Sequence, residues 1–318
     1  MHTEQQSACR VSVIIPTLNA GPEIHILLEK LKQQTIQPHE IIVIDSESTD
    51  GTPQASEKAG AKVITVRRSE FDHGGTRNMA AEAAEGNILL FMTQDAEPLD
   101  EHMIEKLVSP LLAKDKVVYA YARQCARPGA DVLEKLARQY NYPEQSQVKS
   151  FEHVNQMGIK TFFCSNVCAA IRKDTFEAMG KFQAPVIFNE DLFMSARCIL
   201  SGFKVAYCAE ALVYHSHRYT IVQQLRRYFD NGVSMSCNSW MLPYSGVGKA
   251  GSGLVKQQLK ALLNSRRWLH IPRLIIESGA KLIGYKLGIH FRRLPSFIRR
   301  KLSMHSRILD RYIEQNGV

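Results

Sequence analysis

Short apolar runs alternate with helical stretches in the first hundred residues, and this alternation limits the fold more than any other feature of the sequence. The runs cover residues 10–16, 40–45, 62–66 and 87–92. Their length and continuity are typical of buried strands. The segments between the first runs, 22–34 and 53–59, have helical patterns instead. Strands that alternate with short helices predict βαβ units, and therefore an α/β fold with a mostly parallel sheet.

The last of these runs ends in two acids. Asp95 and Glu97 follow it and are one residue apart. In an open α/β sheet, ligands bind outside the carboxyl ends of the strands. Two neighbouring carboxylates repel each other unless a cation, a proton or hydrogen bonds compensate their charge. A hard divalent metal between acid oxygens and a substrate phosphate would do so. A polar strand end followed by a turn at Pro98 explains the same residues without a ligand.

The segment FDHGGTRN, residues 71–78, has the features of a phosphate-binding turn. Gly74 and the glycine after it let the backbone approach a ligand closely. Thr76 is expected to be the N-cap of the helix that follows. A helix N-terminus with His73 and Arg77 nearby suits a phosphate. A purely structural turn before a helix fits the same residues.

A second acidic site, Glu190 and Asp191, opens another predicted helix. Acids at a helix N-terminus are also ordinary complements of the helix dipole. Further along, His215 and His217 alternate, so they share one face if the strand before them continues. Two histidines beside a cationic site could supply a metal ligand. Two surface histidines are the other interpretation.

The basic charge is concentrated near the C-terminus. The net charge is +9, and nine of the 40 Lys and Arg residues fall between Lys281 and Arg311, where Asp310 is the only acid. From residue 219 the pattern is helical, with basic and aromatic residues side by side. Amphipathic basic helices of this kind can lie on an anionic membrane surface. A solvated helical subdomain that packs on the core is the alternative.

Nothing in the sequence predicts a chain that crosses a membrane. No apolar run approaches the roughly 18 residues that a spanning helix needs, and the first ten residues lack the apolar region of a secretory signal. The seven cysteines include no CxxC pair and no zinc pattern. We therefore expect a cytoplasmic protein with reduced thiols.

The ordered set of motifs resembles the family 2 glycosyltransferases. It consists of VSVIIPTLN at 11–19, IIVIDSESTDGT at 41–52, Asp95, and Glu190 with Asp191. The resemblance implies a GT-A fold, in which an α/β domain, here residues 1–218, binds a nucleotide-sugar at its strand ends. A C-terminal helical region, residues 219–318, would follow. The resemblance also implies a transferase that inverts the anomeric centre and needs Mg²⁺ or Mn²⁺.

Roles in donor binding follow from the same resemblance. The residues that would contact the nucleotide or the diphosphate are Thr17, Asn19, Asp45, His73, Gly74, Arg77 and Asp95.

Roles at the metal and in catalysis follow as well. Asp95 matches the first acid of the family's DxD element, and Glu97 stands where the second Asp often lies. The Thr-Gln before Asp95 departs from the pattern. His215 or His217 matches a late His that some GT-A enzymes add to the metal. Asp191 matches the catalytic base, and Glu190 would shape the site or hold the acceptor.

Finer motifs are similar to the bacterial rhamnosyltransferase subgroup. They are FDHGGTRN at 71–78, TQDA at 93–96, VYHSH at 213–217, GYKLG at 284–288 and Leu294 with Pro295. This implies dTDP-L-rhamnose as donor and a polyprenyl-diphosphate-linked glycan as acceptor, in the synthesis of O-antigen or another surface polysaccharide. Such an enzyme would be peripheral on the inner face of the cytoplasmic membrane, where the basic C-terminal helices would contact the anionic membrane surface.

Three alternatives stay open. The enzyme could transfer the sugar of another nucleotide-sugar. It could be a processive polysaccharide synthase, because QLRRY at 224–228 is close to the QxxRW element of those enzymes, although an ordinary amphipathic helix also fits. A nucleic-acid-binding protein would use the basic tail, but no helix-turn-helix, zinc finger or RRM signature is present. We therefore expect no nucleic-acid partner.

Overall fold

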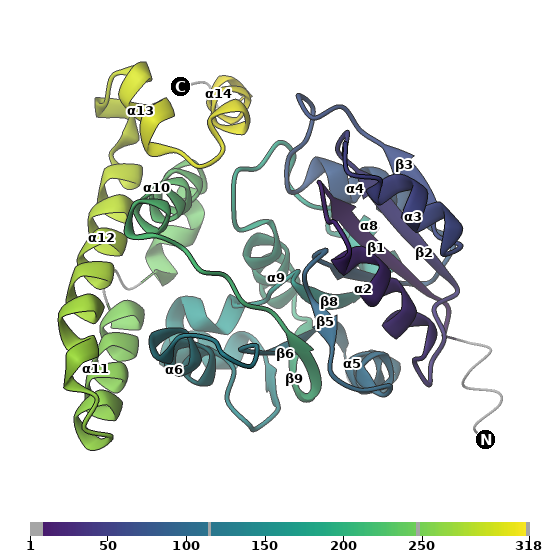
Figure 1. Cartoon of the computed structure of the whole chain (residues 1–318), viewed down its shortest axis with the longest axis horizontal. Coiled ribbons are helices and arrows are strands. Elements are labelled where there is room, and N and C mark those ends of the chain that lie inside the picture. Colours follow the sequence, from purple (N-terminus) through teal and green to yellow (C-terminus); the bar gives the residue numbers. More distant parts are fainter. Residues whose placement is uncertain (1–8, 114–115, 246–248, 316–318) are drawn as a thin grey trace.

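The computed structural model describes residues 9–113, 116–245 and 249–315, and within them one sheet of nine strands organises the fold (Figure 1). The strands are β1 (Val11–Thr17), β2 (Glu40–Asp45), β3 (Lys62–Thr65), β4 (Ile88–Met92), β5 (Glu97–Pro98), β6 (Val117–Cys125), β7 (Gln147–Lys149), β8 (Cys168–Arg172) and β9 (Lys204–Tyr214). Their order is β3-β2-β1-β4-β8-β6-β9-β5, and β7 pairs with β9 outside this path.

The first four strands in this order are parallel. β1 pairs with both β2 and β4, and β2 pairs with β3. Thr17 lies opposite Asp45 in the register, so the carboxyl ends of β1 and β2 meet at one edge. β8 is antiparallel to β4 and β6, which makes the sheet mixed, while β6 and β9 are parallel to each other.

Helices cover both faces of the sheet. The helices of the first two thirds of the chain are α2 (Glu23–Lys32), α3 (Thr52–Lys58), α4 (Gly75–Glu82), α5 (Met103–Leu112), α6 (Val132–Asn141), α7 (Val154–Met157), α8 (Lys173–Ala178) and α9 (Glu190–Leu200). α2 and α5 pack on one face of the sheet, through one hydrophobic cluster. α4, α8 and α9 pack on the other face, through a second cluster. Alternate residues of β1 and β4 enter the two clusters, as expected of strands buried on both sides.

The last third of the chain is helical. It contains α10 (Ile221–Cys237), α11 (Lys249–Asn264), α12 (Ile271–Ile289), α13 (Ser296–Leu302) and α14 (Ser306–Gln315). α12 runs along the left edge of Figure 1 and packs on α10. A Cβ atom at Gly284 or Gly288 would lie only 2.2 or 2.1 Å from a backbone oxygen of α10, so glycine is required for this close contact.

Several expectations differ from the structure. Thr76 is not an N-cap, because α4 begins one residue earlier and Gly74 precedes it. The sequence predicts a strand at 204–207 and a further segment at 211–217, but β9 is one strand that ends at Tyr214, before the two histidines. The several glycines in the second half of segment 238–253 predict a loop, but the segment contains a 3₁₀ helix, Ser239–Tyr244, and the start of α11; residues 246–248 lie outside the described residues. Over residues 128–148 the sequence predicts helix and loop without clear bounds, and α6 lies there.

Among the described residues, none of the helices combines the length and hydrophobicity that crossing a bilayer requires.

Candidate active site

A large cavity lies at the carboxyl ends of the strands. Its volume is about 2340 Å³, and its walls come from the sheet edge and from the C-terminal helices. Thr17, Asp95 and Asp191 line the sheet side, and Lys281 of α12 lines the helical side. Residues from both of the predicted parts of the chain therefore form one site.

Asp95, His215 and His217 form a group that could hold a metal ion. One ligand atom from each lies within 4.8 Å of the others. Asp95 Oδ2 is 3.5 Å from Nε2 of His215 and 3.2 Å from Nε2 of His217. The two histidines extend beyond β9, so their convergence comes from the chain after the strand and not from a strand face.

The surroundings of His215 suit a metal ligand. Its Nδ1 lies 2.9 Å from Oε1 of Gln124 on β6. Nη2 of Arg138, which can only donate a hydrogen bond, lies 3.1 Å from the same Nδ1. The other ring nitrogen, Nε2, faces Asp95. Burial, followed by the nearby charge of Arg138, lowers the pKa of His215 well below its usual value. The imidazole is therefore neutral, as coordination requires.

Glu97, the predicted second acidic ligand, is not part of this group. Its two carboxylate oxygens each lie 2.6 Å from a cation, Nζ of Lys30 and Nη1 of Arg127. Burial alone would raise the pKa of Glu97, but the two cations outweigh it and the pKa is lowered. Both oxygens of Glu97 are thus paired with cations and lie outside the group around Asp95, and the role of Glu97 as a metal ligand stays a prediction.

Gln94 accounts for the departure from the acidic motif. Its side-chain oxygen accepts a hydrogen bond from the backbone N–H of Leu18 at 2.8 Å, and its amide group donates to the Leu18 carbonyl at 3.2 Å. A single side chain thus joins the loop after β4 to the loop after β1. A carboxylate could accept the first of these bonds but could not donate the second.

Asp191 lies at the first turn of α9 and faces the cavity. Its Oδ2 accepts a hydrogen bond from the backbone N–H of Asn166 at 3.0 Å. Burial, together with the negative charge of Glu190, raises the pKa of Asp191 to about 7. A carboxylate with this pKa can accept a proton near neutral pH.

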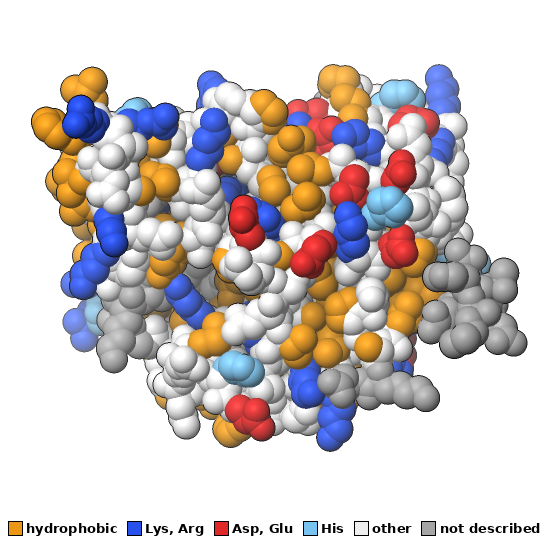
Figure 2. All heavy atoms as spheres, turned by 90° about the horizontal axis from the view of Figure 1, so that it is seen from below, with side chains coloured by type: hydrophobic (Ala, Val, Ile, Leu, Met, Phe, Trp, Pro, Cys, Tyr) orange, Lys and Arg blue, Asp and Glu red, His pale blue; other side chains and the backbone are white. Residues whose placement is uncertain are grey.

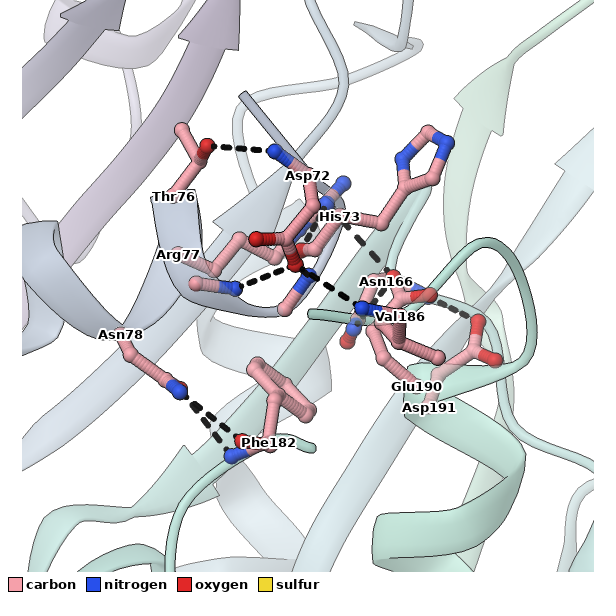
Figure 3. A network of polar contacts seen from close by, with 12 residues as sticks. Asp72, His73, Thr76, Arg77, Asn78, Asn166, Phe182, Val186, Glu190 and Asp191 are labelled. Atoms are coloured by element: carbon pink, nitrogen blue, oxygen red, sulfur yellow. Dashed lines mark hydrogen bonds and ion pairs between the residues drawn. The ribbon is translucent and has the colours of Figure 1, made fainter. Parts of the chain in front are cut away.

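Glu190 is buried and paired. It lies 3.5 Å from Nη1 of Arg77 and accepts a hydrogen bond from Asn166 Nδ2 at 3.2 Å (Figure 3). Arg77 also donates to the carbonyl oxygen of His73 at 2.8 Å. Arg77 lines the cavity as predicted, but its charge is shared with Glu190 before any ligand binds.

Asp72 organises the predicted phosphate-binding turn. One of its oxygens accepts hydrogen bonds from the backbone N–H groups of Gly74, Gly75 and Val186 at 3.0, 2.8 and 3.1 Å (Figure 3). The N–H of Gly74 is therefore already bonded. A Cβ at Gly74 would lie 1.9 Å from the carbonyl oxygen of Gln183, so this glycine allows a close contact with protein backbone and not with a ligand. His73 does line the cavity, and its buried Nε2 has no hydrogen-bond partner within the part of the chain that the structure describes.

The predicted nucleotide-binding residues divide into two kinds. Thr17 lines the cavity and donates a hydrogen bond to Oδ1 of Asp45 at 2.8 Å. Asp45 itself is buried and also accepts hydrogen bonds from the backbone and hydroxyl of Ser48. Asn19 is exposed and accepts a hydrogen bond from the N–H of Thr49 at 2.9 Å. Asp45 and Asn19 therefore hold the two strand-end loops together, and Thr17 faces the cavity.

Sequence reasoning missed three residues of the site, namely Asn166, Gln124 and Asp72. Asn166 contacts both acids of α9 and accepts a hydrogen bond from the hydroxyl of Tyr119 at 2.6 Å. Neither Asn166 nor Gln124 lies in a motif, so no local signal marks them. Asp72 does stand two residues before the glycines, where an Asp side chain often accepts hydrogen bonds from the following turn.

Two close relatives extend over almost the whole chain. O-antigen chain rhamnosyltransferase RfbN of Salmonella typhimurium is 41% identical over 304 residues, which cover 93% of this chain and 95% of that protein. O-antigen chain rhamnosyltransferase WbaN of Salmonella anatum is 42% identical over 299 residues, covering 92% and 94%.

Solved structures share the fold at low identity. Mannosyltransferase PcManGT from Pyrobaculum calidifontis, in complex with GDP-Man and Mn²⁺, has a TM-score of 0.56 and 18% identity, covering 86% of this chain and 87% of that one. TarS 1-349 of S. aureus, in complex with UDP-GlcNAc, has a TM-score of 0.56 and 16% identity, covering 89% and 92%. The fold is therefore of the GT-A type, as expected. Residues 12–180 match the family described as Glycosyl transferase family 2. With this match and its two relatives, the chain belongs to glycosyltransferase family 2.

Proposed function

We propose that this enzyme transfers L-rhamnose from dTDP-rhamnose, with inversion, to a polyprenyl-diphosphate-linked glycan in O-antigen synthesis. The observation that carries the proposal is the 41% identity to an O-antigen chain rhamnosyltransferase over 93% of the chain. The geometry of the cavity agrees with it, because a group suited to a metal and a carboxylate suited to a base line the same space.

Asp191 is the base in this proposal. The acceptor hydroxyl is a weak nucleophile, and a carboxylate that takes its proton during attack contributes typically 10²–10⁴-fold to the rate. The pKa of about 7 leaves Asp191 largely ionised at slightly alkaline pH. The N–H of Asn166 holds one carboxylate oxygen in place. Attack from the side opposite the leaving diphosphate inverts the sugar carbon.

Asp95, His215 and His217 would hold the metal ion. Their donor set, one carboxylate oxygen and two imidazole nitrogens, fits Mn²⁺ better than Mg²⁺, which takes oxygen ligands. A bound metal would stabilise the negative charge that develops on the leaving nucleoside diphosphate. Thr17 and Arg77 line the cavity on the same side and would contact the donor.

The outer side of the C-terminal helical region is the proposed contact with an anionic membrane. An apolar stripe on α12 and the turn before it includes Trp268, Leu269, Ile275 and Ile276, which are 63%, 95%, 64% and 54% exposed. Hydrophobic side chains adjoin Lys and Arg side chains along the left edge of Figure 2, the side on which α11 and α12 lie. This combination is typical of helices in a membrane interface. The boundary between residues 218 and 219 is likewise a proposal: the part before it would supply the base and the metal site, and the part after it would supply the membrane contact and one wall of the cavity.

The apolar stripe precedes the most basic segment of the tail. Part of that basic segment packs on the rest of the protein, because Arg311 of α14 donates to the carbonyl oxygens of Glu70 and Phe71 at 3.0 and 2.7 Å. The test therefore changes the stripe: the double variant Ile275→Ser with Ile276→Ser should bind anionic vesicles more weakly in a flotation assay. Ile26→Ser, which changes an isoleucine of similar exposure on α2, is the matched control. Equal binding by the double variant and the wild type would reject this surface as the membrane contact.

A panel of nucleotide-sugars tests the donor. Calorimetry with dTDP-rhamnose, UDP- and GDP-sugars, each with and without Mn²⁺, should give the tightest binding for dTDP-rhamnose with metal. Tighter binding of a UDP- or GDP-sugar would reject dTDP-rhamnose as the donor and would leave the fold and the proposed base unaffected. Folded protein that binds no donor would reject the proposed activity.

A further inference from the structure

One face of α12 lines the cavity with hydrogen-bond donors. Ser278, Lys281, Leu282 and Tyr285 all line it, and they follow one another at helical spacing on this face. The two hydroxyl groups and the ammonium group therefore project toward the same part of the cavity, away from the strand ends. An oxyanion with several acceptor oxygens would match this face.

Among the residues that the structure describes, no carboxylate lies within ion-pair distance of Lys281. Arg273 pairs with Asp131 at 2.8 Å and with Glu277, which also lines this wall, at 2.6 Å. The Nζ of Lys281 lies 6.0 Å from the ring centre of Tyr228 on α10. Burial lowers the pKa of Lys281, although the charge of Glu277 acts in the opposite direction, and an anionic ligand would offset the cost of burial.

The cavity wall adjoins the apolar outer side of the same helix. Leu282 lines the cavity and is 50% exposed, and the next residue, Ile283, is 54% exposed. Ile275 and Ile276 continue the apolar surface toward the N-terminus of α12. A molecule with an anionic group at Lys281 could thus lay a hydrocarbon chain over Leu282 without crossing a polar barrier.

We propose that Lys281, with the hydroxyls of Ser278 and Tyr285, binds the diphosphate of a prenyl-diphosphate-linked acceptor whose hydrocarbon chain leaves the cavity over Leu282. The inference rests on the proposed function for the nature of the acceptor. It adds where the diphosphate binds, namely on α12 and apart from the donor side of the cavity. The glycan would then extend from this wall toward Asp191.

Binding of farnesyl diphosphate to the full chain tests the inference without depending on transfer. Calorimetry would compare farnesyl diphosphate, inorganic pyrophosphate and farnesol on the wild type, Lys281→Met, Lys281→Arg and Lys286→Met. Lys286 is the matched control, because it is an exposed lysine on the same helix that does not line the cavity. We expect Lys281→Met to weaken farnesyl diphosphate binding at least about tenfold, the usual cost of losing a charged hydrogen-bonding partner. Lys281→Arg should restore most of the affinity, and Lys286→Met should leave it unchanged.

The three ligands separate the sources of affinity. Wild-type binding should be tighter for farnesyl diphosphate than for pyrophosphate or farnesol, since the site takes both ends of the molecule. Equal affinity for pyrophosphate and farnesyl diphosphate would reject the apolar exit over Leu282. No binding of farnesyl diphosphate, or an equal loss in Lys281→Met and Lys286→Met, would overturn the assignment of Lys281. A chain that binds farnesyl diphosphate through Lys281 but transfers no rhamnose would instead reject the proposed function alone.

Discussion

The two acidic pairs, Asp95 with Glu97 and Glu190 with Asp191, have one acid each that is paired with cations. They differ in the neutral groups that lie beside the other acid. In each pair one acid is held by cations: Glu97 by Lys30 and Arg127, and Glu190 by Arg77. Asp95 and Asp191 line the cavity, and so does Glu190, whereas Glu97 does not. Asp95 has two imidazoles beside it, whereas Asp191 has the amide N–H of Asn166.

We propose that this difference separates a metal ligand, Asp95, from a base, Asp191. Imidazole nitrogens beside Asp95 add ligand atoms for a cation. Asp191 has no such neighbours, and burial together with Glu190 raises its pKa to about 7. In this proposal the paired acids Glu97 and Glu190 add charge or structure, and Glu190 also lines the cavity.

The largest expected effect belongs to Asp191→Asn. The variant keeps the shape of the side chain and removes the proton acceptor, so kcat should fall about thousandfold. Binding of dTDP-rhamnose, measured by calorimetry, should change little, because the donor contacts lie on the other side of the cavity. Equal loss of binding and transfer would contradict the base role.

Asp95→Asn should weaken metal binding without removing the proposed proton acceptor, Asp191. We expect the variant's affinity for Mn²⁺, measured by titration and electron paramagnetic resonance of the free ion, to fall at least about 100-fold. Loss of a group that only supports a metal ligand can already cost about this much, and Asp95 is proposed to be a ligand itself. Asp191→Asn is the control and should bind Mn²⁺ as the wild type does. The comparison between the two pairs fails if both variants lose the metal equally.

The pH dependence of kcat should report the pair on α9. Asp191 must be ionised to take a proton, so kcat should rise with pH and reach half of its maximum near the pKa of about 7. The negative charge of Glu190 contributes to this raised pKa, so Glu190→Gln should move the rise to lower pH. Glu97→Gln, on the other pair, should leave the position of the rise unchanged. A rise that stays in place in Glu190→Gln would mean that another group controls it.

Much of the sheet could be predicted from the sequence, because β1, β2 and β4 are buried on both faces and read as unbroken apolar runs. The sequence predicts separate segments at 204–207 and 211–217, yet residues 208–210 belong to the same strand, β9, in which Ala209 is buried and Glu210 is exposed. A register shift between β6 and β9 in this region keeps the strand continuous. Pairing with a distant strand decided this element, and no local pattern contains that information.

The site shows the same limit at the level of single residues. Asp95 and Asp191 could be found because each lies next to a recognisable strand end or helix start. The ion pairs of Glu97 could not be predicted, because Lys30 comes from α2 and Arg127 from the chain after β6. The role of Asn166 could not be predicted either, because it depends on contacts with residues 24 and 25 positions further along the chain.

Glu97→Gln should have the smallest effect and sets the final contrast between the pairs. Its affinity for Mn²⁺ should equal that of the wild type, because Glu97 pairs with Lys30 and Arg127, while its free energy of unfolding should fall by about 1 kcal/mol, as for a partly exposed ion pair. The folded-state pKa of Glu97 is lowered, so this stabilisation is present above the unfolded pKa and is lost as the pH falls through the folded pKa. Denaturant unfolding of the variant and the wild type should therefore converge at acid pH. Glu29→Gln, which removes an exposed pair with Lys32, should change the stability less at every pH. If Glu97→Gln instead abolished Mn²⁺ binding, Glu97 would be a ligand after all, and the two acidic pairs would no longer divide into one paired and one active member each.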